Sequence, residues 1–319
     1  MVFVSKKVIK GKPRYYLEKS LRFPDHKTKK FSVYLKDYSA DKPSDLAKYK
    51  EILNDKVIEA QKEFVIKYYK KDYIFTEETL KKLENIKVGY EEVLKKLTKQ
   101  QLKDLLDRFT VNFTYESNAI EGNSLTLKDV TFIIKEGKVL KNKDLREVYE
   151  TLNTRKAIDI LFAGKFKINN KDIIKLHSIL IENTGVAERY KRFPNFLLGR
   201  NLETTPPEKV EAEMNKLVSW YNENKELHPL QLATIFHGKF ERIHPFEDGN
   251  GRVGRLLINV ILMEKGYPPL IIRKTQRIKY FNALQAFDNK HFDKLYRFVL
   301  GKYKDTFEKF FMIYIKYLD

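Results

Sequence analysis

The densest group of chemically useful side chains lies in the stretch HPFEDGNGRVGR, which runs from His244 to Arg255. Its twelve residues include one imidazole, two carboxylates, three glycines, one side-chain amide and two guanidinium groups. Glycine lets the backbone approach a ligand closely. Backbone N–H groups at the start of a helix lack partners, and the helix dipole adds positive potential there. The stretch therefore predicts an anion cradle suited to phosphate groups.

The charged residues of this stretch suggest how such a cradle would be used. Arg252 and Arg255 are three residues apart, so in a helical turn they share a face and can grip phosphate oxygens. A carboxylate beside phosphate is repulsive unless it holds a divalent metal, so Asp248 or Glu247 is a candidate ligand for Mg²⁺. His244, at the entry, is placed to take a proton from an incoming hydroxyl. These residue types indicate Mg²⁺-assisted transfer of part of a nucleotide to a hydroxyl group.

Simpler interpretations of the glycine-rich stretch fit less well. A helix–helix turn with solvated charges does not require a histidine, two acids and two arginines at set offsets. No G-x-x-x-x-G-K-[ST] loop lies nearby, and DGNG lacks the alternating acids and terminal Glu of an EF-hand.

The twelve residues resemble the signature of Fic proteins, His-x-Phe-x-(Asp/Glu)-Gly-Asn-Gly-Arg-x-x-Arg, at every fixed position. A second stretch, SNAIEGN from Ser117 to Asn123, is similar to the family's inhibitory motif, (Ser/Thr)-x-x-x-Glu-(Gly/Asn). The similarity runs from about Tyr115 to the end of the second helix that flanks the loop. The resemblance implies a mostly α fold, with a Fic-type helical core and a β-hairpin flap, to which an N-terminal β segment and further helices are added.

The resemblance also implies an activity, protein adenylylation. AMP moves from ATP to a Ser, Thr or Tyr hydroxyl of a protein, and pyrophosphate is released. His244 would be the general base, and Asp248 would bind Mg²⁺ through the α- and β-phosphates. Arg252 would contact the β-phosphate region and Arg255 the γ-phosphate, while Glu247 occupies a variable position and receives no role. The other residues implied in fixing the loop or binding the nucleotide are Phe246, Gly249, Asn250, Gly251 and Gly254.

The second motif implies that the enzyme is autoinhibited. Glu121 follows Ser117 by four residues, so the two share a helix face. A carboxylate there can form a two-point ion pair with Arg255 and withdraw it from the γ-phosphate. ATP would then bind with a misaligned α-phosphate. We therefore expect Glu121→Gly to raise adenylylation, including self-modification; a solvated Glu at a helix end is the alternative.

The elements that position these motifs follow from residue periodicity. Residues 1–36 alternate as strands do and predict an antiparallel hairpin or three-stranded meander. After Pro43 the apolar residues recur at helical spacing. We predict helices at about 45–71, 76–97, 98–122 (opened by a capping box at Thr98), 126–136, 144–163, 170–185 (with Asn170 as N-cap), 208–225, 229–243, 254–265, 278–288 and 292–316.

Together with the resemblance to Fic proteins, this pattern divides the chain into four predicted parts: residues 1–110, an N-terminal β and helical region; 111–125, the inhibitory helix and motif; 126–303, the catalytic domain; and 304–319, a C-terminal helix. The segment 192–204 corresponds by position to the family's flap, where a target protein docks by strand addition. The aromatic run FEKFFMIYIKYL near the C-terminus is interpreted as a packing helix, and a homodimer interface is the alternative.

Composition indicates a globular protein. The 319 residues are 42% hydrophobic, and cysteine is absent, as is typical of a reducing cytoplasm. The N-terminus lacks the apolar run of a signal peptide, and LLINVILM is too short for a membrane span of about 20 residues. The net charge of +19 allows nucleic-acid binding, and residues 1–36 hold eleven Lys and Arg against Glu18 and Asp25. Because no nucleic-acid motif accompanies it, the charge favours a soluble, Lys-rich surface.

Three rival functions remain open at this point. A Doc-type phosphotransferase binds ATP in reverse, although Gly251 and Arg255 favour the adenylyl orientation. Removal of AMP from modified proteins would use Glu121 to act on water. A nucleic-acid-binding regulator with a vestigial site is the non-enzymatic alternative. The remaining histidines that attract attention, His177 and His237, are interpreted as packing residues.

Overall fold

A computed structural model describes residues 2–23, 25–36, 38, 46–139, 141–195 and 203–315. The chain divides into two compact units, Met1–Val88 and Gly89–Asp319. Helix α2 (Glu77–Lys96) continues through this boundary. The four functional parts expected from the sequence stay a prediction.

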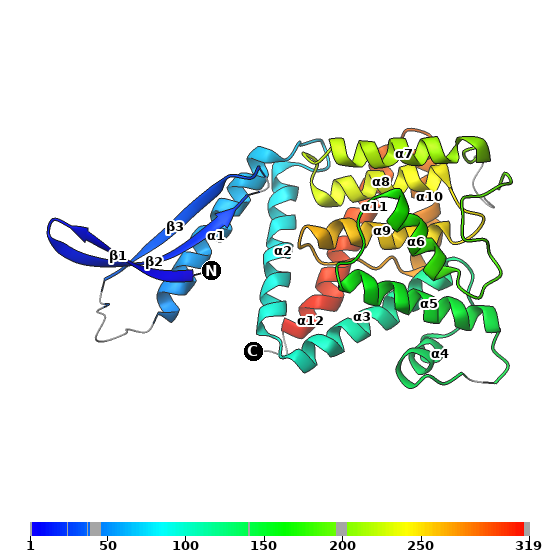
Figure 1. Cartoon of the computed structure of the whole chain (residues 1–319), viewed down its shortest axis with the longest axis horizontal. Helices are drawn as coiled ribbons and strands as arrows, with labels where there is room; N and C mark the ends of the chain where they lie inside the picture. The colour runs from blue at the N-terminus through cyan, green and yellow to red at the C-terminus, as the bar shows by residue number, and fades with distance from the viewer. Residues whose placement is uncertain are drawn as a thin grey trace. The chain divides into compact units, whose positions relative to one another are not determined.

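The first unit is a small sheet packed on one helix. Strands β1 (Val2–Ile9), β2 (Lys12–Arg22) and β3 (Thr28–Leu35) form an antiparallel sheet in the order β1-β2-β3, which confirms the predicted meander. Buried residues alternate along β3, so one face of the sheet is apolar. That face packs on α1 (Ala47–Tyr68), which lies along the sheet in Figure 1.

The second unit is helical, and it confirms the mostly α fold. Helix α8 (Pro229–Ile243) contacts α7 (Pro207–Glu223) on one side and α9 (Asn250–Glu264) on the other, as Figure 1 shows. Among the described residues, no helix combines the length and apolar character needed to cross a membrane. The other elements are α3 (Lys99–Ile120), α4 (Leu127–Thr131), a π-helical turn (Phe132–Glu136), α5 (Leu145–Phe162), α6 (Asn170–Leu180), a 3₁₀ turn (Lys274–Gln276), α10 (Arg277–Asp288), α11 (Phe292–Thr306), a second π-helical turn (Phe307–Phe311) and α12 (Met312–Ile315).

The two helices around the signature loop have sharp ends. Helix α8 begins at Pro229, which suits a first helical position, and ends at Ile243 as predicted. His244 then turns the chain with a left-handed φ of 51°. Helix α9 starts at Asn250, four residues earlier than we predicted, after Gly249 at φ 82°. The glycines that indicated a longer loop lie inside the helix, where other side chains approach them closely.

Some other boundaries differ from the prediction. Asn169, not Asn170, caps α6, because its side-chain oxygen accepts from the backbone N–H of Asp172 at 2.8 Å. The helices predicted at 126–136 and 292–316 both contain a π-helical turn. Residues 196–202 of the predicted flap lie outside the described residues.

Candidate active site

The signature loop is held by a buried aromatic residue. The Phe246 side chain is fully buried, and its ring stacks on that of His177 with centroids 3.7 Å apart. His177 Nε2 lies 3.0 Å from the Asp248 carbonyl oxygen, within hydrogen-bond distance. Burial lowers the pKa of His177 to about 4, so the ring is neutral at pH 7. His177 is therefore a packing residue, as expected, and its ring also holds the signature loop in place.

Asn250 closes the same loop from the helix side. Its Oδ1 accepts from the Phe246 backbone N–H at 2.9 Å, and its Nδ2 donates to the Phe246 carbonyl at 2.8 Å. We expected this side chain to hold phosphate. Asn250 therefore shapes the loop through the backbone of Phe246, and phosphate binding by the second N–H of its Nδ2 stays a prediction.

Arg255 is gripped by the second motif. The Arg255 side chain is only 2% exposed, and its Nη1 lies 2.7 Å from Glu121 Oε1. Its Nε donates to Ser117 Oγ at 3.0 Å, and its Nη2 donates to the Ser117 carbonyl at 2.9 Å. The expected two-point pair with Glu121 is therefore replaced by a grip that both motif residues share. Although burial opposes the charge, the nearby Glu121 raises the pKa of Arg255, which stays charged.

The glycine at the second position of α9 allows this arrangement. A Cβ atom on Gly251 would overlap Glu121 Oε1 and would lie 2.9 Å from Arg255 Nη1. The carboxylate consequently rests against the first turn of α9, where unpaired backbone N–H groups attract anions.

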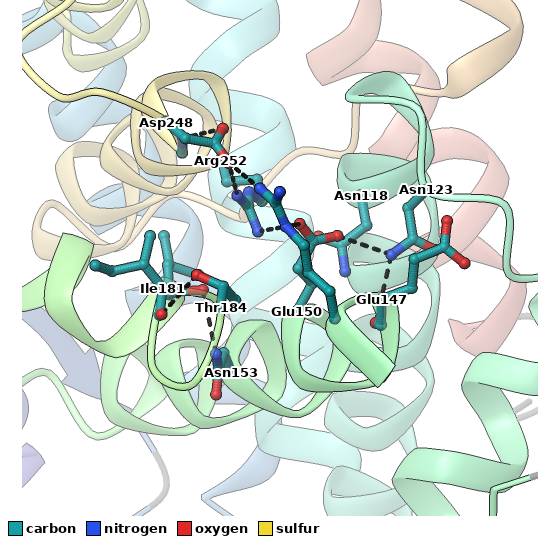
Figure 2. A network of polar contacts seen from close by, with 12 residues as sticks. Asn118, Asn123, Glu147, Glu150, Asn153, Ile181, Thr184, Asp248 and Arg252 are labelled. Atoms are coloured by element: carbon teal, nitrogen blue, oxygen red, sulfur yellow. Dashed lines mark hydrogen bonds and ion pairs between the residues drawn. The ribbon is translucent and has the colours of Figure 1, made fainter. Parts of the chain in front are cut away.

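Arg252 has its own acidic partners. Figure 2 shows it between Glu150 of α5 and Asp248 of the loop. Its Nη1 lies 3.3 Å from Glu150 Oε1, and its Nη2 lies 3.4 Å from Asp248 Oδ2. Asn123, the last residue of the second motif, donates to Glu150 Oε2 at 3.0 Å. Glu150 therefore connects that motif to the loop, a role that its spacing in the sequence does not indicate.

Asp248 is the acid of the loop that is best placed to meet a ligand. Its side chain is 43% exposed, and Arg146 Nη2 from α5 lies 2.5 Å from its Oδ2. Arg146 thus places a positive charge beside the carboxylate expected to hold a metal. Within the described residues, no group of three or more His, Asp or Glu side chains could bind a metal by itself.

His244 ends α8, and its backbone N–H donates to the Phe240 carbonyl at 2.9 Å. Its side chain is half-buried, directly before the loop. His237, two helical turns deeper in α8, is fully buried, as expected for a packing residue. His237 Nε2 lies 2.7 Å from the Tyr280 hydroxyl.

A buried lysine joins the two ends of the predicted flap. Lys191 is 3% exposed, and its Nζ donates to Asn195 Oδ1 and to Thr204 Oγ1, both at 2.7 Å. The Lys191 backbone N–H donates to the Pro245 carbonyl at 2.9 Å, and Asn195 Nδ2 donates to the Phe246 carbonyl at 2.8 Å. These bonds tie the flap ends to the signature loop. Apart from its place beside the flap, nothing in the sequence indicates this cluster.

Known proteins resemble this chain in sequence over more than half of its length. The profile of the Fic/DOC family matches residues 167–262. Protein adenylyltransferase fic-1 of Caenorhabditis elegans is 32% identical over 182 residues, which are 54% of this chain and 36% of that protein. Protein adenylyltransferase Fic of Nematostella vectensis is 34% identical over 193 residues, 58% of this chain and 45% of that protein. The chain therefore spans less than half the length of these two relatives.

Solved structures show the same fold. A Fic domain containing signaling protein from Bacteroides thetaiotaomicron aligns with a TM-score of 0.65 at 26% identity, over 71% of this chain and 94% of that one. Residues 134–508 of C. elegans Fic-1 align with a TM-score of 0.60 at 26% identity, over 72% of this chain and 70% of that one.

Proposed function

We propose that this chain is a protein adenylyltransferase and that residues 167–262, which match the profile of the Fic/DOC family, form its Fic domain. It would transfer AMP from ATP to a Ser, Thr or Tyr hydroxyl of a target protein. The observation that supports this most is the pair of buried arginines at the start of α9, directly after a loop that begins with His244. The curated relatives that match more than half of the chain are named protein adenylyltransferases.

The chemistry assigned to His244 is a proton transfer. The target hydroxyl attacks the α-phosphorus of ATP, and its proton passes to the His244 ring. A new oxygen–phosphorus bond forms, the bond from the α-phosphorus to the bridging oxygen breaks, and pyrophosphate leaves. A positioned base of this kind contributes typically about 10²–10⁴-fold to the rate.

The arginines supply the charge that this step needs. Arg252 and Arg255 would bind the β- and γ-phosphates, and the N–H groups of Gly249 and Gly251 at the start of α9 would add to the cradle. Gly254 leaves room for two side chains of α8, because a Cβ there would lie 2.6 Å from Glu241 Oε1 and 2.9 Å from the His237 ring. Loss of either arginine is expected to weaken nucleotide binding.

The site fits a Mg²⁺ ion that takes most of its ligands from the nucleotide and water. Asp248 offers a partly exposed carboxylate oxygen beside the arginine cluster. One or two carboxylates with phosphate oxygens are the usual protein contribution to Mg²⁺ binding. When bound, the ion would neutralise developing charge on the phosphates.

Glu121 would hold the enzyme in an inactive state. Its carboxylate occupies Arg255 and rests at the start of α9, so the γ-phosphate and Glu121 compete for one arginine. Displacement of Glu121 would free Arg255 and align the α-phosphate for attack. Misplacement of about 1 Å can cost roughly 10²-fold in rate.

The rival activities are not favoured by the names of the curated relatives. Transfer of the α-phosphate label of ATP to protein, without the γ-phosphate label, would support adenylylation. Transfer of the γ-phosphate label alone would replace it with phosphotransfer. A target that docks on the flap, self-modification, a homodimer and a cytoplasmic location stay predictions.

A further inference from the structure

The sheet of the first unit has a second face, which α1 does not cover. Leu17 and Val33 point toward α1, and because side chains alternate along a strand, their neighbours Tyr16 and Tyr34 point away from it. The uncovered face combines cations with aromatic rings. We call it the basic face and define it by Phe3, Lys7, Arg14, Tyr16, Lys30 and Tyr34.

The aromatic rings of the basic face form a cross-strand pair. Tyr16 and Tyr34 are register partners on β2 and β3, with ring centroids 5.4 Å apart. Lys7 Nζ lies 4.7 Å from the Tyr16 ring centroid, and the Arg14 guanidinium carbon lies 5.6 Å from that of Tyr34. Tyr34 carries a large ring that is 43% exposed, and none of the described helices of its unit covers this face. Exposed aromatic side chains flanked by cations indicate a binding surface rather than a merely soluble one.

Glu18, an acidic residue on this face, is paired with two lysines. Glu18 is completely buried, with Lys7 Nζ 3.1 Å and Lys30 Nζ 2.5 Å from its two carboxylate oxygens. Although burial acts to raise the pKa of Glu18, the hydrogen bonds from these two lysines lower it overall. Two cations therefore surround one carboxylate, and Arg14 adds a further charge. The face keeps a net positive charge that a polyanion would complement.

More cations extend the same face along β2. Lys12 and Arg22 are exposed and occupy the same alternate positions of the strand as Arg14 and Tyr16. Across residues 1–36, Glu18 and Asp25 are the only acids against eleven Lys and Arg. Composition alone favours a solvated surface, because it does not show that the cations and the tyrosines share one face.

We propose that the basic face binds duplex DNA in the major groove. A B-form major groove is about 12 Å wide and admits a two-stranded β-ribbon. Three strands at about 4.8 Å spacing place the backbones of the outer two roughly 10 Å apart, which is within that width. Strands of eight and eleven residues run far enough to follow several base pairs at about 3.3 Å per residue. The cations would meet phosphates on the groove walls, and the tyrosines would face base edges.

Duplex DNA is preferred to the other polyanions on geometric grounds. The major groove of A-form RNA is too narrow for side chains to read, so a three-stranded surface does not fit it. A membrane surface would favour an amphipathic helix with a broad apolar face. Single-stranded nucleic acid would instead stack its bases on the tyrosines. Tighter binding of a single strand than of the duplex is therefore a separate outcome of the test.

The test measures binding of the full chain to a 20-base-pair DNA duplex by fluorescence anisotropy, at about 50 to 300 mM salt. The face variant is Lys12→Gln/Arg14→Gln/Arg22→Gln, which removes three cations without touching the partners of Glu18. The control variant, Lys81→Gln/Lys82→Gln/Lys95→Gln, removes the same charge from exposed positions of α2. We expect the plot of log K against log [salt] to become shallower by about three units in the face variant and not in the control.

A second variant, Tyr34→Ser, keeps the charge and is expected to weaken duplex binding about tenfold by loss of the aromatic contact. Circular dichroism establishes that each variant is folded before its binding is interpreted. The proposal is overturned if the face and control variants bind alike. It is also overturned if wild-type protein binds a single strand more tightly than the duplex, or binds phosphatidylserine vesicles but not DNA.

Discussion

The carboxylate of Glu121 lies against Gly251, in the space that a Cβ atom at position 251 would occupy. The same carboxylate pairs with Arg255 Nη1 at 2.7 Å. One acidic side chain thus covers both the guanidinium and the helix terminus that would bind the outer phosphates of a nucleotide. Glu121 and a bound triphosphate would therefore compete for the same groups.

This competition predicts different effects on different nucleotides. Glu121→Gly should tighten binding of a non-hydrolysable ATP analogue by about fivefold or more, because Arg255 becomes available to the γ-phosphate. AMP, which lacks the outer phosphates, should bind with little change. Titration calorimetry of both ligands with wild-type and variant protein provides the measurement. An equal gain for AMP and the ATP analogue would contradict the assignment of Arg255.

Glu150 is expected to stabilise the loop through Arg252. The Arg252 side chain is 2% exposed, so replacing its acidic partner leaves a buried charge poorly matched. Glu150→Gln should lower the free energy of unfolding by about 1–3 kcal/mol. Urea unfolding measures the loss. As a control, Glu91→Gln removes the partner of Lys95 on the exposed part of α2, where a surface pair contributes little. Equal stability of the two variants would argue against a structural role for Glu150.

His177 makes the loop sensitive to acid. Its pKa in the folded chain is about 4, mainly because of burial, against an ordinary value of 6.5. The neutral ring is favoured in the folded state, so its contribution to stability is complete above pH 6.5 and is lost as the pH falls toward 4. The loss can reach roughly 3 kcal/mol.

Unfolding experiments at pH 7.5 and pH 4.5 test this expectation. His177→Phe keeps an aromatic ring against Phe246 but cannot take up a proton, so it should show a smaller acid-dependent loss than wild type. His291→Gln, at an exposed position before α11, should behave as wild type does. If His177→Phe lost as much stability as wild type, another group would be responsible.

Lys191 is expected to position the flap and the loop without contacting the nucleotide. Lys191→Met keeps the apolar stem but releases Asn195 and Thr204, so we expect transfer to fall about tenfold through misplacement. The free energy of unfolding should change less than the transfer rate. Burial lowers the pKa of Lys191 to about 8, so burying its ammonium group is costly and Met removes that cost. Initial rates and urea unfolding together separate the two effects. Lys209→Met, an exposed change in α7, is the control, and unchanged rates in Lys191→Met would refute the positioning role.

The sequence predicted the local parts of this architecture well. The bounds of α8 were correct because Pro229 and the apolar spacing mark both ends of the helix. The capping box at Thr98 was also correct, since its partners lie three residues apart. The start of α9 was wrong because glycines normally favour loops. Here Gly251 and Gly254 are in the helix, where Glu121 and His237 leave no room for a Cβ.

Contacts between residues far apart in the sequence could not be predicted from spacing or local motifs. The motif residues Glu121 and Arg255 could be matched because a known family pairs them. Arg146 lies 102 residues before Asp248, and Glu150 similarly reaches Arg252 from another helix. Nothing in the spacing of either residue marks it. The charges come together only in the folded chain, where α5 and α9 both contact α3 and α6.

We propose that the signature loop transfers AMP, with His244 as the base and Glu121 as the inhibitor. Intact-mass spectrometry of Glu121→Gly protein incubated with Mg²⁺ and each nucleoside triphosphate tests it most directly. We expect the mass of AMP to be added with ATP, less of it in wild-type protein, and none in Glu121→Gly/His244→Ala. Addition of phosphate alone, no addition, or full AMP addition without His244 would contradict the account.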